Sequence, residues 1–388
     1  MSEINHYLEA IENIWNPIYG ISNDESLRNN TLLYNGNKKQ LEETDCNIVL
    51  IGVPEDRNSA DINQCSKSPD EIRKILYGLR GLRGIKLLDA GNIRGKKVND
   101  RYNALKETAK WFLNKNKILI ILGGTQELTV PVFEYLASIK NKVNLTVCDA
   151  MIDLDFSRKD FSSRAWLQII TENYKKSLED LTIMGVQNYL ITEQLENYIN
   201  KEYHDIIRLS DIRGANMNKS EVPLRDSDII SLDFRTIVGK NTFSENIVSP
   251  HGIEPYEACK LCHYAGLSEK LSVMGLFETT IDNKTENAPN AALAAQMLWH
   301  FMDGVAGRNY DFPSENSIIY KNYMVFLESV GKEIRFHNNS ANGRWWMEVP
   351  ADEGENKIFS CNHEEYLIAM DNELPDKWWR LFMKNRKL

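Results

Sequence analysis

The sequence predicts an α/β protein in which a mainly parallel sheet of about eight strands lies between two layers of helices. Two observations favour this class: short apolar runs recur along the chain, and helical patterns separate them. At 42% hydrophobic residues, the chain can also build a large core. The predicted strands lie at residues 47–53, 85–91, 117–124, 143–150, 181–186, 204–210, 228–234 and 271–278.

Four amphipathic segments between these runs predict helices. They are residues 68–79, 99–115, 253–266 and 290–304. The first of them begins with Ser68 before Pro69, an order typical of an N-cap followed by the first helical residue.

The composition and hydrophobic patterning of the chain predict three parts. Residues 1–44 are a polar, Asn-rich extension with an amphipathic helix in "YLEAIENIW", residues 45–305 are the α/β domain, and residues 306–388 lose the alternation. The last part carries two tryptophan pairs, Trp345 with Trp346 and Trp378 with Trp379. Two roles are open for them: packing on the core, or an interface with a partner or another subunit.

The composition and charge of the chain argue against some classes of function. A formal net charge of −9 and a pI near 5.5 argue against general nucleic-acid binding, because phosphates require a basic surface. No apolar run is long enough to span a bilayer, and the N-terminus is not signal-like, so we expect a cytoplasmic protein. The six cysteines form no disulfide framework, as expected of free thiols in a reducing compartment.

Two cysteine features have competing interpretations. Cys259, Cys262 and His263 have the spacing of a haem attachment site, but they lie in a helical pattern, which favours ordinary helix packing. Cys148 precedes Asp149 and alternates to the opposite side of its strand, which favours a buried structural thiol over a nucleophile.

Polar residues gather where three of the predicted strands end. They lie in "GGTQ" (123–126), in "CDAMIDLDF" (148–156) and in "LDFR" (232–235). Because ligand sites of parallel sheets form at the carboxyl ends of the strands, we expect these segments to build one site.

The three segments resemble the metal-binding motifs of the ureohydrolase family, which includes arginase, agmatinase and formimidoylglutamase. The family patterns are Gly-Gly-Asp-His, Asp-Ala-His-x-Asp and Ser-x-Asp-x-Asp, and the match runs in order over about residues 45–305. The resemblance implies a three-layer, arginase-like fold and a site that holds two manganese ions in the family.

Carried over position by position, the six ligand positions are only partly preserved. They fall on Gln126, Asp149, Met151, Asp153, Asp233 and Arg235. The resemblance places Gln126 and the three aspartates around one metal ion, and this all-oxygen set suits a single Mn²⁺, Mg²⁺ or Ca²⁺. The other ion would need a thioether and a guanidinium, which are unsuitable ligands, so we do not expect binuclear manganese.

Arg235 suggests how the lost ion is replaced. We hypothesise that its guanidinium forks onto Asp149 or Asp233, because clustered carboxylates need a compensating cation. Met151 would then fill apolar space beside it.

Four further residues are candidates for the site. The family's guanidinium-binding glutamate falls near Thr280, and Glu278 would face the same side if the strand alternation continued, so it is a possible substitute. His251, on the loop that shapes substrate access in the family, is either a general base or an ordinary loop histidine. Asp155 is either an outer acceptor of the site or a helix cap.

Two functions therefore compete. The first is a ureohydrolase-fold protein that has lost its binuclear centre and acts as a binding or structural component. It would contact a second copy of the chain or another protein through its terminal extensions. The alternative is a divergent metal-dependent hydrolase of C–N bonds in guanidino, amidino or formimino compounds. It would use a mononuclear centre, with Glu278 or His251 for proton transfer.

Overall fold

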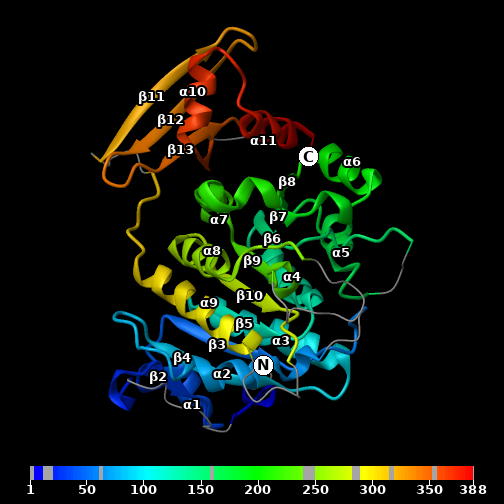
Figure 1. Cartoon of the computed structure of the whole chain (residues 1–388), viewed down its shortest axis with the longest axis vertical. Coiled ribbons are helices and arrows are strands. Elements are labelled where there is room, and N and C mark those ends of the chain that lie inside the picture. Colours follow the sequence, from blue (N-terminus) through cyan, green and yellow to red (C-terminus); the bar gives the residue numbers. More distant parts are fainter. Residues whose placement is uncertain are drawn as a thin grey trace.

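The computed structural model describes residues 4–11, 21–60, 64–157, 161–238, 250–281, 289–313, 319–351 and 356–387. It comprises an α/β body and a smaller C-terminal unit of four strands and two helices, which lies at one end of the body (Figure 1).

The body is built on a ten-stranded sheet with the order β1-β4-β3-β5-β10-β9-β6-β7-β8, in which β2 also pairs with β4. All of its pairings are parallel except that of β1 with β4. The eight predicted strands are confirmed, and the nearly continuous burial of all of them except the half-buried edge strand β8 explains why they read as apolar runs. They are β3 (Ile48–Val53), β4 (Leu87–Ile93), β5 (Ile118–Gly123), β6 (Val143–Cys148), β7 (Leu178–Val186), β8 (Asp205–Arg208), β9 (Ile229–Asp233) and β10 (Val273–Phe277).

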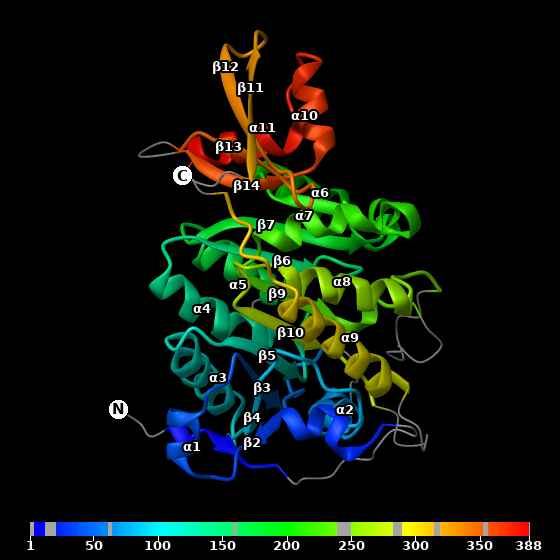
Figure 2. The ribbon, with the colours of Figure 1, turned by 90° about the vertical axis from the view of Figure 1, so that its left-hand side faces the viewer.

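Helices cover both faces of the sheet, as predicted (Figure 2). One face is covered by α3 (Val98–Leu113), α4 (Thr129–Ile139), α5 (Trp166–Asn173) and α6 (Glu193–Lys201). The other is covered by α2 (Ser68–Leu76), α7 (Glu221–Asp226), α8 (Pro255–Leu267) and α9 (Pro289–Ala306). Among the described helices, none is both long and apolar enough to cross a membrane.

Two local predictions were wrong. Within the predicted N-terminal helix, Leu8–Glu9 forms strand β1, because its backbone pairs with the edge of β4; residues 12–15 of that segment lie outside the described part. Ser68 is already the first residue of α2 and does not cap it, since its hydroxyl donates to the carbonyls of Cys65 and Gly123. The N-terminal region also contributes β2 (Thr31–Leu33) and α1 (Lys38–Glu43).

The C-terminal unit has a core of its own. Strands β11 (Tyr320–Leu327), β12 (Lys332–Asn339), β13 (Trp345–Val349) and β14 (Lys357–Cys361) form an antiparallel sheet in that order. Helices α10 (His363–Met370) and α11 (Asp376–Lys387) pack on it. Each tryptophan pair is divided: Trp346 and Trp378 are buried, whereas Trp345 is half-buried and Trp379 is exposed.

Charged side chains fasten this unit to the body. On α11, Arg380 binds Asp180 of β7 through both guanidinium nitrogens, and the Nζ atom of Lys384 lies 2.9 Å from the Nδ1 atom of His204. Arg380 holds the pKa of Asp180 far below its usual value, although burial alone would raise it.

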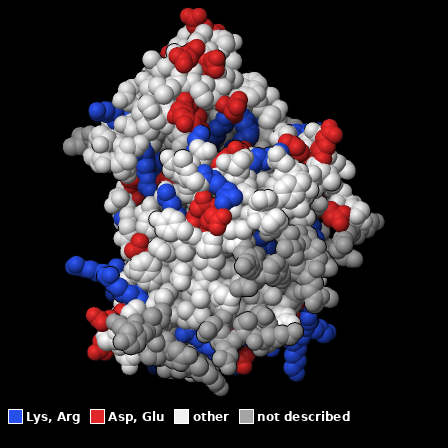
Figure 3. Space-filling model, viewed as in Figure 1, with Lys and Arg blue, Asp and Glu red and all other residues white. Residues whose placement is uncertain are grey.

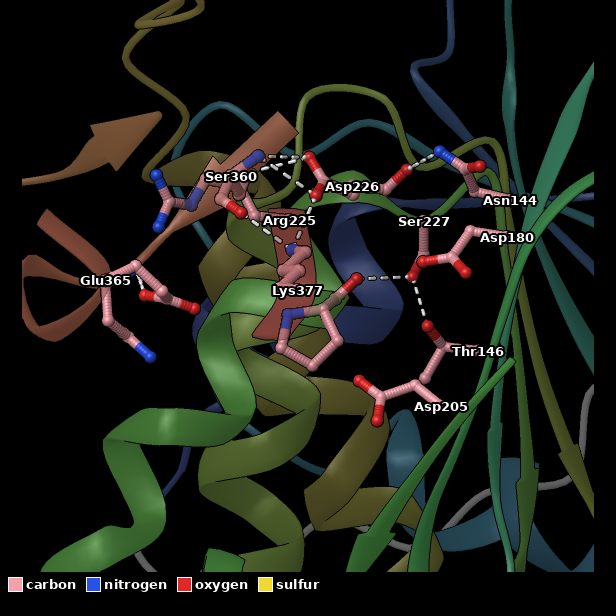
Figure 4. A network of polar contacts seen from close by, with 12 residues as sticks. Asn144, Thr146, Asp180, Asp205, Arg225, Asp226, Ser227, Ser360, Glu365 and Lys377 are labelled. Atoms are coloured by element: carbon pink, nitrogen blue, oxygen red, sulfur yellow. Dashed lines mark hydrogen bonds and ion pairs between the residues drawn. The ribbon is translucent and has the colours of Figure 1, made fainter. Parts of the chain in front are cut away.

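A second group of contacts centres on Asp226, at the end of α7 (Figure 4). Its carboxylate accepts hydrogen bonds from the backbone and the hydroxyl of Ser360 in β14, and from Lys377 in α11. The neighbouring Arg225 lies 4.6 Å above the Trp346 ring. The buried tryptophan of the first pair therefore packs at the junction with the body.

The surface is hollowed where the C-terminal unit meets α7, and charges of both signs gather there (Figure 3). A pocket of about 330 Å³ lies at this junction, with walls from β8, α7, α10 and α11.

Candidate functional site

Four neighbouring strand ends build the predicted site. Strands β5, β10, β9 and β6 lie side by side, and polar residues follow or end each of them. These are Gln126 after β5, Glu278 after β10, Asp233 at the end of β9 and Asp149 after β6. The parallel sheet therefore brings together residues that are up to 152 positions apart in the chain.

Three aspartates form the centre of this site. The carboxylates of Asp149, Asp153 and Asp233 each offer an oxygen within 4.8 Å of the others, and all three residues are buried. Clustered, buried carboxylates of this kind repel one another and require protons or cations.

Arg235 supplies one of these cations, in the way we hypothesised. Its Nε atom lies 2.9 Å and its Nη2 atom 2.6 Å from the Oδ2 atom of Asp233, and its backbone N–H donates to Oδ1 at 2.7 Å. Nη2 also lies 3.7 Å from the Glu278 carboxylate. Burial would lower the pKa of Arg235, but these two carboxylates outweigh it and raise the pKa well above its usual value.

Arg164 supplies a second positive charge, which the sequence analysis missed. Its Nη1 atom lies 3.5 Å from the Oδ1 atom of Asp153 and 3.2 Å from the sulfur of Met151. The indole N–H of Trp166 donates to the Oδ2 atom of Asp153 at 3.2 Å. Met151 thus accepts from Arg164, and we had expected it only to fill apolar space beside Arg235.

No motif marks Arg164, which lies on the loop before α5. The number of carboxylates in the site was the signal that could have predicted a second cation, because several buried carboxylates need more than one positive partner. Asp155, in the same segment, accepts from the backbone and hydroxyl of Ser157, so it stabilises a local turn.

Among the described residues of the site, carboxylates still outnumber guanidiniums. Asp149, Asp153, Asp233 and Glu278 face only Arg164 and Arg235 among the described contacts. Burial raises the pKa of Glu278 to about 8, against the lowering effect of Arg235. Burial also raises the pKa of Asp149 and of Asp153, and for Asp149 the two neighbouring aspartates add to the shift. The site is therefore ready to bind protons or a cation.

Within the described residues, two buried oxygens of the site have no hydrogen-bond partner: the Oε1 atom of Gln126 and the Oδ2 atom of Asp149. The amide nitrogen of Gln126 is in contrast fixed, since it donates to the Ser231 hydroxyl at 3.1 Å. Buried acceptors without partners are rare in proteins and often mark a missing ion or water. Carbonyl and carboxylate oxygens are also the ligands that Mg²⁺, Ca²⁺ and Mn²⁺ prefer, so the predicted ligand set fits one such ion.

A tight turn holds Gln126 in place. A Cβ atom on Gly124 would lie 1.5 Å from the carbonyl oxygen of Glu55, so only glycine allows this close approach. The backbone N–H of Thr125 donates to the same carbonyl, and the N–H of Gln126 donates to Glu278 at 3.1 Å.

Glu278 reaches the site for a different reason from the one we gave. Strand β10 ends at Phe277, and Glu278 has a positive φ of 57°, so the strand alternation does not extend to Thr280. This backbone conformation is costly for a non-glycine residue and is frequent at functional sites. Thr280 is half-buried, and its carbonyl accepts from Asn290.

His251 is not part of the carboxylate cluster. The described group of potential metal-binding side chains contains only the three aspartates. His251 is exposed and lines a separate pocket of about 300 Å³ with Arg208 and Arg213, at the ends of β7 and β8. Cys148, Cys259 and Cys262 are buried free thiols, as the structural interpretation predicts.

A family model decides the relationship that these motifs suggested. The model described as the arginase family matches residues 46–303, about two thirds of the chain. The chain belongs to the arginase family. The predicted resemblance and the arginase-like α/β fold are therefore confirmed.

Solved structures of this family share the fold at low identity. Formiminoglutamase from Trypanosoma cruzi, solved with Mn²⁺, is 20% identical, with a TM-score of 0.61 over 68% of this chain and 95% of that one. Formimidoylglutamase from Bacillus subtilis is 16% identical, with a TM-score of 0.65 over 77% and 96%. Agmatine ureohydrolase from Thermoplasma volcanium is 21% identical, with a TM-score of 0.55 over 67% and 90%.

No curated protein sequence matches the chain significantly. The C-terminal unit begins after the last residue that the family model matches.

Proposed function

We propose that this arginase-family protein has lost the binuclear hydrolytic centre and acts as a binding or structural component, with at most one divalent cation in its carboxylate site. The observation that carries this proposal is the contact of Arg235 with Asp233, inside the cluster of aspartates. A guanidinium in this position supplies positive charge but no lone pair for a metal ion.

Both the chemistry and the position of two residues support the loss of the second ion. The family's ligand positions for it hold Met151 and Arg235, and the Met151 sulfur accepts from Arg164. A thioether binds hard divalent cations poorly, and a guanidinium does not bind them. Both changes act on the same ion, which supports replacement of that ion by an arginine.

The remaining site suits one hard cation. Gln126, Asp149, Asp153 and Asp233 would hold it, through the two oxygens that otherwise lack partners and through the carboxylates beside them. A single ion of this kind supplies charge compensation and Lewis acidity. The reactivity of the family, in contrast, depends on a water that two ions acidify together.

Metal analysis of the purified chain tests this proposal directly. We expect plasma mass spectrometry to find no more than one equivalent of Mn, Mg or Ca per chain, and less in Asp153→Ala. In the matched double variant Met151→His with Arg235→Asp, which restores the family residues, we expect a second equivalent. Two equivalents of Mn in the wild type would overturn the proposal.

A divergent hydrolase is the second candidate, and one observation favours it. Glu278 is fully buried in the site, has a strained backbone and has a pKa of about 8, which suits proton transfer near neutral pH. The substrates of such a hydrolase would be guanidino, amidino or formimino compounds, as in the related enzymes. A screen of such compounds with added Mn²⁺ separates the candidates: we expect no turnover, whereas turnover that Glu278→Gln and Asp233→Ala abolish would establish the hydrolase.

The binding role is assigned to the parts outside the arginase-family match. The C-terminal unit has its own core, and the contacts of Asp226 and Arg225 attach it to the body. It therefore presents an ordered surface on which a partner can bind. The partner is either a second copy of the chain or another protein.

A further inference from the structure

Strand β11 is an uncovered edge of the C-terminal sheet. It pairs with β12 on one side, and within the described residues no strand lies on its other side. The opposite edge of the sheet, β14, is in contrast covered, because α7 packs on it and the backbone N–H of Ser360 donates to Asp226. In Figures 1 and 2 the β11–β12 hairpin projects away from the body.

The uncovered strand carries apolar side chains on a face that no helix of the described part of the chain covers at Met324 and Phe326. Met324 and Phe326 are each 58% exposed, whereas Val325 and Leu327 point to the other face and are buried. On β12, the residues opposite Met324 and Phe326 are Arg335 and Glu333, so their cross-strand partners are charged and not apolar.

Beyond Lys321, this edge strand lacks the usual protection against strand pairing. Residues 323–327 read "YMVFL", with no charge, proline or glycine among them. Natural proteins interrupt exposed edges with charged residues, bulges or proline, because an open edge offers free backbone groups to another strand. An edge of this kind is expected to be covered in the functional assembly.

We propose that β11 pairs with β11 of a second copy of this chain, in antiparallel orientation about a twofold axis at Val325. This interface extends the proposed binding role by naming the strand and the partner, and it does not depend on the state of the metal site.

The register follows from self-complementarity. With the axis at Val325, every pair matches apolar with apolar or polar with polar: Val325 with Val325, Met324 with Phe326, Tyr323 with Leu327, and Asn322 with Glu328. An axis at Met324 would instead place Asn322 opposite Phe326 and Lys321 opposite Leu327. An axis at Phe326 would place Met324 opposite Glu328. Side-chain matching specifies register wherever one face of a strand is apolar, so the axis at Val325 is favoured.

A charge substitution tests the interface. In the full chain carrying Met324→Lys and Phe326→Lys, we expect sedimentation equilibrium to find half as many chains per particle as in the wild type. Both positions are exposed, so the fold should survive. The matched control is Tyr256→Lys on α8, which is 78% exposed and should keep the wild-type mass. Equal masses for the wild type and the double variant would overturn the proposal.

Cysteine cross-linking tests the register and does not depend on the stability of the charged variant. All six native cysteines are buried, so the background should be low. Mixing Met324→Cys chains with Phe326→Cys chains under oxidised glutathione should give a disulfide-linked dimer, because these positions are directly opposed. Each variant alone should cross-link far more slowly. Rapid cross-linking of Met324→Cys alone would overturn the register, and no cross-link in the mixture would overturn the interface.

Discussion

Two of the arginine–aspartate pairs among the described residues, Arg73 with Asp89 and Arg235 with Asp233, differ in how completely they are satisfied. Arg73 of α2 binds Asp89 of β4 through Nε and Nη2 at 2.7 and 3.0 Å, and its remaining donors reach Asn92, Asp70 and the carbonyl of Gly91. The Arg73 guanidinium therefore leaves none of its nitrogens without a partner.

The pair formed by Arg235 and Asp233 has similar distances but different surroundings. Two more aspartates and Glu278 lie around it, and the nearby Asp149 carboxylate keeps an oxygen without a partner. The first pair is a closed structural contact, whereas the second leaves room for a proton or a cation. Geometry alone does not separate the two pairs; the balance of charge around them does.

The largest expected effect comes from breaking the closed pair. Arg73→Met should leave Asp89 buried and unpaired, and should lower the free energy of unfolding by about 3–5 kcal/mol in urea denaturation. Added Mn²⁺ should leave the free energy of unfolding of this variant unchanged. The control is Lys74→Met, which removes only a surface contact with Glu71 and should cost less than about 1 kcal/mol.

Arg235→Met should cost less than Arg73→Met, about 2 kcal/mol, because the carboxylates that lose their partner can take up a proton or a cation. At a concentration a hundred times its dissociation constant, Mn²⁺ should then raise the free energy of unfolding of this variant by about 2.7 kcal/mol in the same urea assay. Equal losses in the two arginine variants, with no effect of Mn²⁺ on either, would contradict the comparison.

The carboxylate cluster around Arg235 and Asp233 should also make the free energy of unfolding depend on pH. The pKa of Glu278 is raised in the folded state, so between about pH 4.3 and 8 its carboxyl binds a proton in the native chain and not in the unfolded chain. In metal-free buffer, the contribution of Glu278 to the free energy of unfolding should therefore fall as the pH rises through this window, by up to about 1.4 kcal/mol per unit. In Glu278→Gln this slope should be smaller; an unchanged slope would assign it to other groups.

The smallest expected effect concerns the cation alone. Gln126→Leu removes the oxygen that has no partner, and should weaken Mn²⁺ binding about tenfold, or ~1.4 kcal/mol, in isothermal titration. Gln168→Leu, on the exposed side of α5, should leave the affinity unchanged. If the wild type itself binds no Mn²⁺, the open site is compensated by protons only.

The sequence was sufficient for the parts of this comparison that depend on periodicity and order. Eight short apolar runs predicted eight strands, and the order of three motifs predicted which strand ends meet. The fork of Arg235 onto Asp233 followed from the need to neutralise clustered carboxylates.

The remaining features depend on geometry that spacing does not encode. Arg164 lies on a loop without a motif, and Glu278 enters the site because β10 stops one residue earlier and the backbone turns. Strand β1 forms from a segment with helical spacing, because the edge of β4 offers it backbone partners. In each of these cases a tertiary contact overrides the local pattern.

The contact between Arg380 and Asp180 has a consequence for how the chain is made. The two residues are 200 positions apart, and at 5–20 residues per second the ribosome needs about 10–40 s to travel from one to the other. During that interval β7 exists without the cation that compensates its buried carboxylate. The body therefore cannot reach its final state before α11 has been synthesised, because only then does Asp180 gain its guanidinium partner.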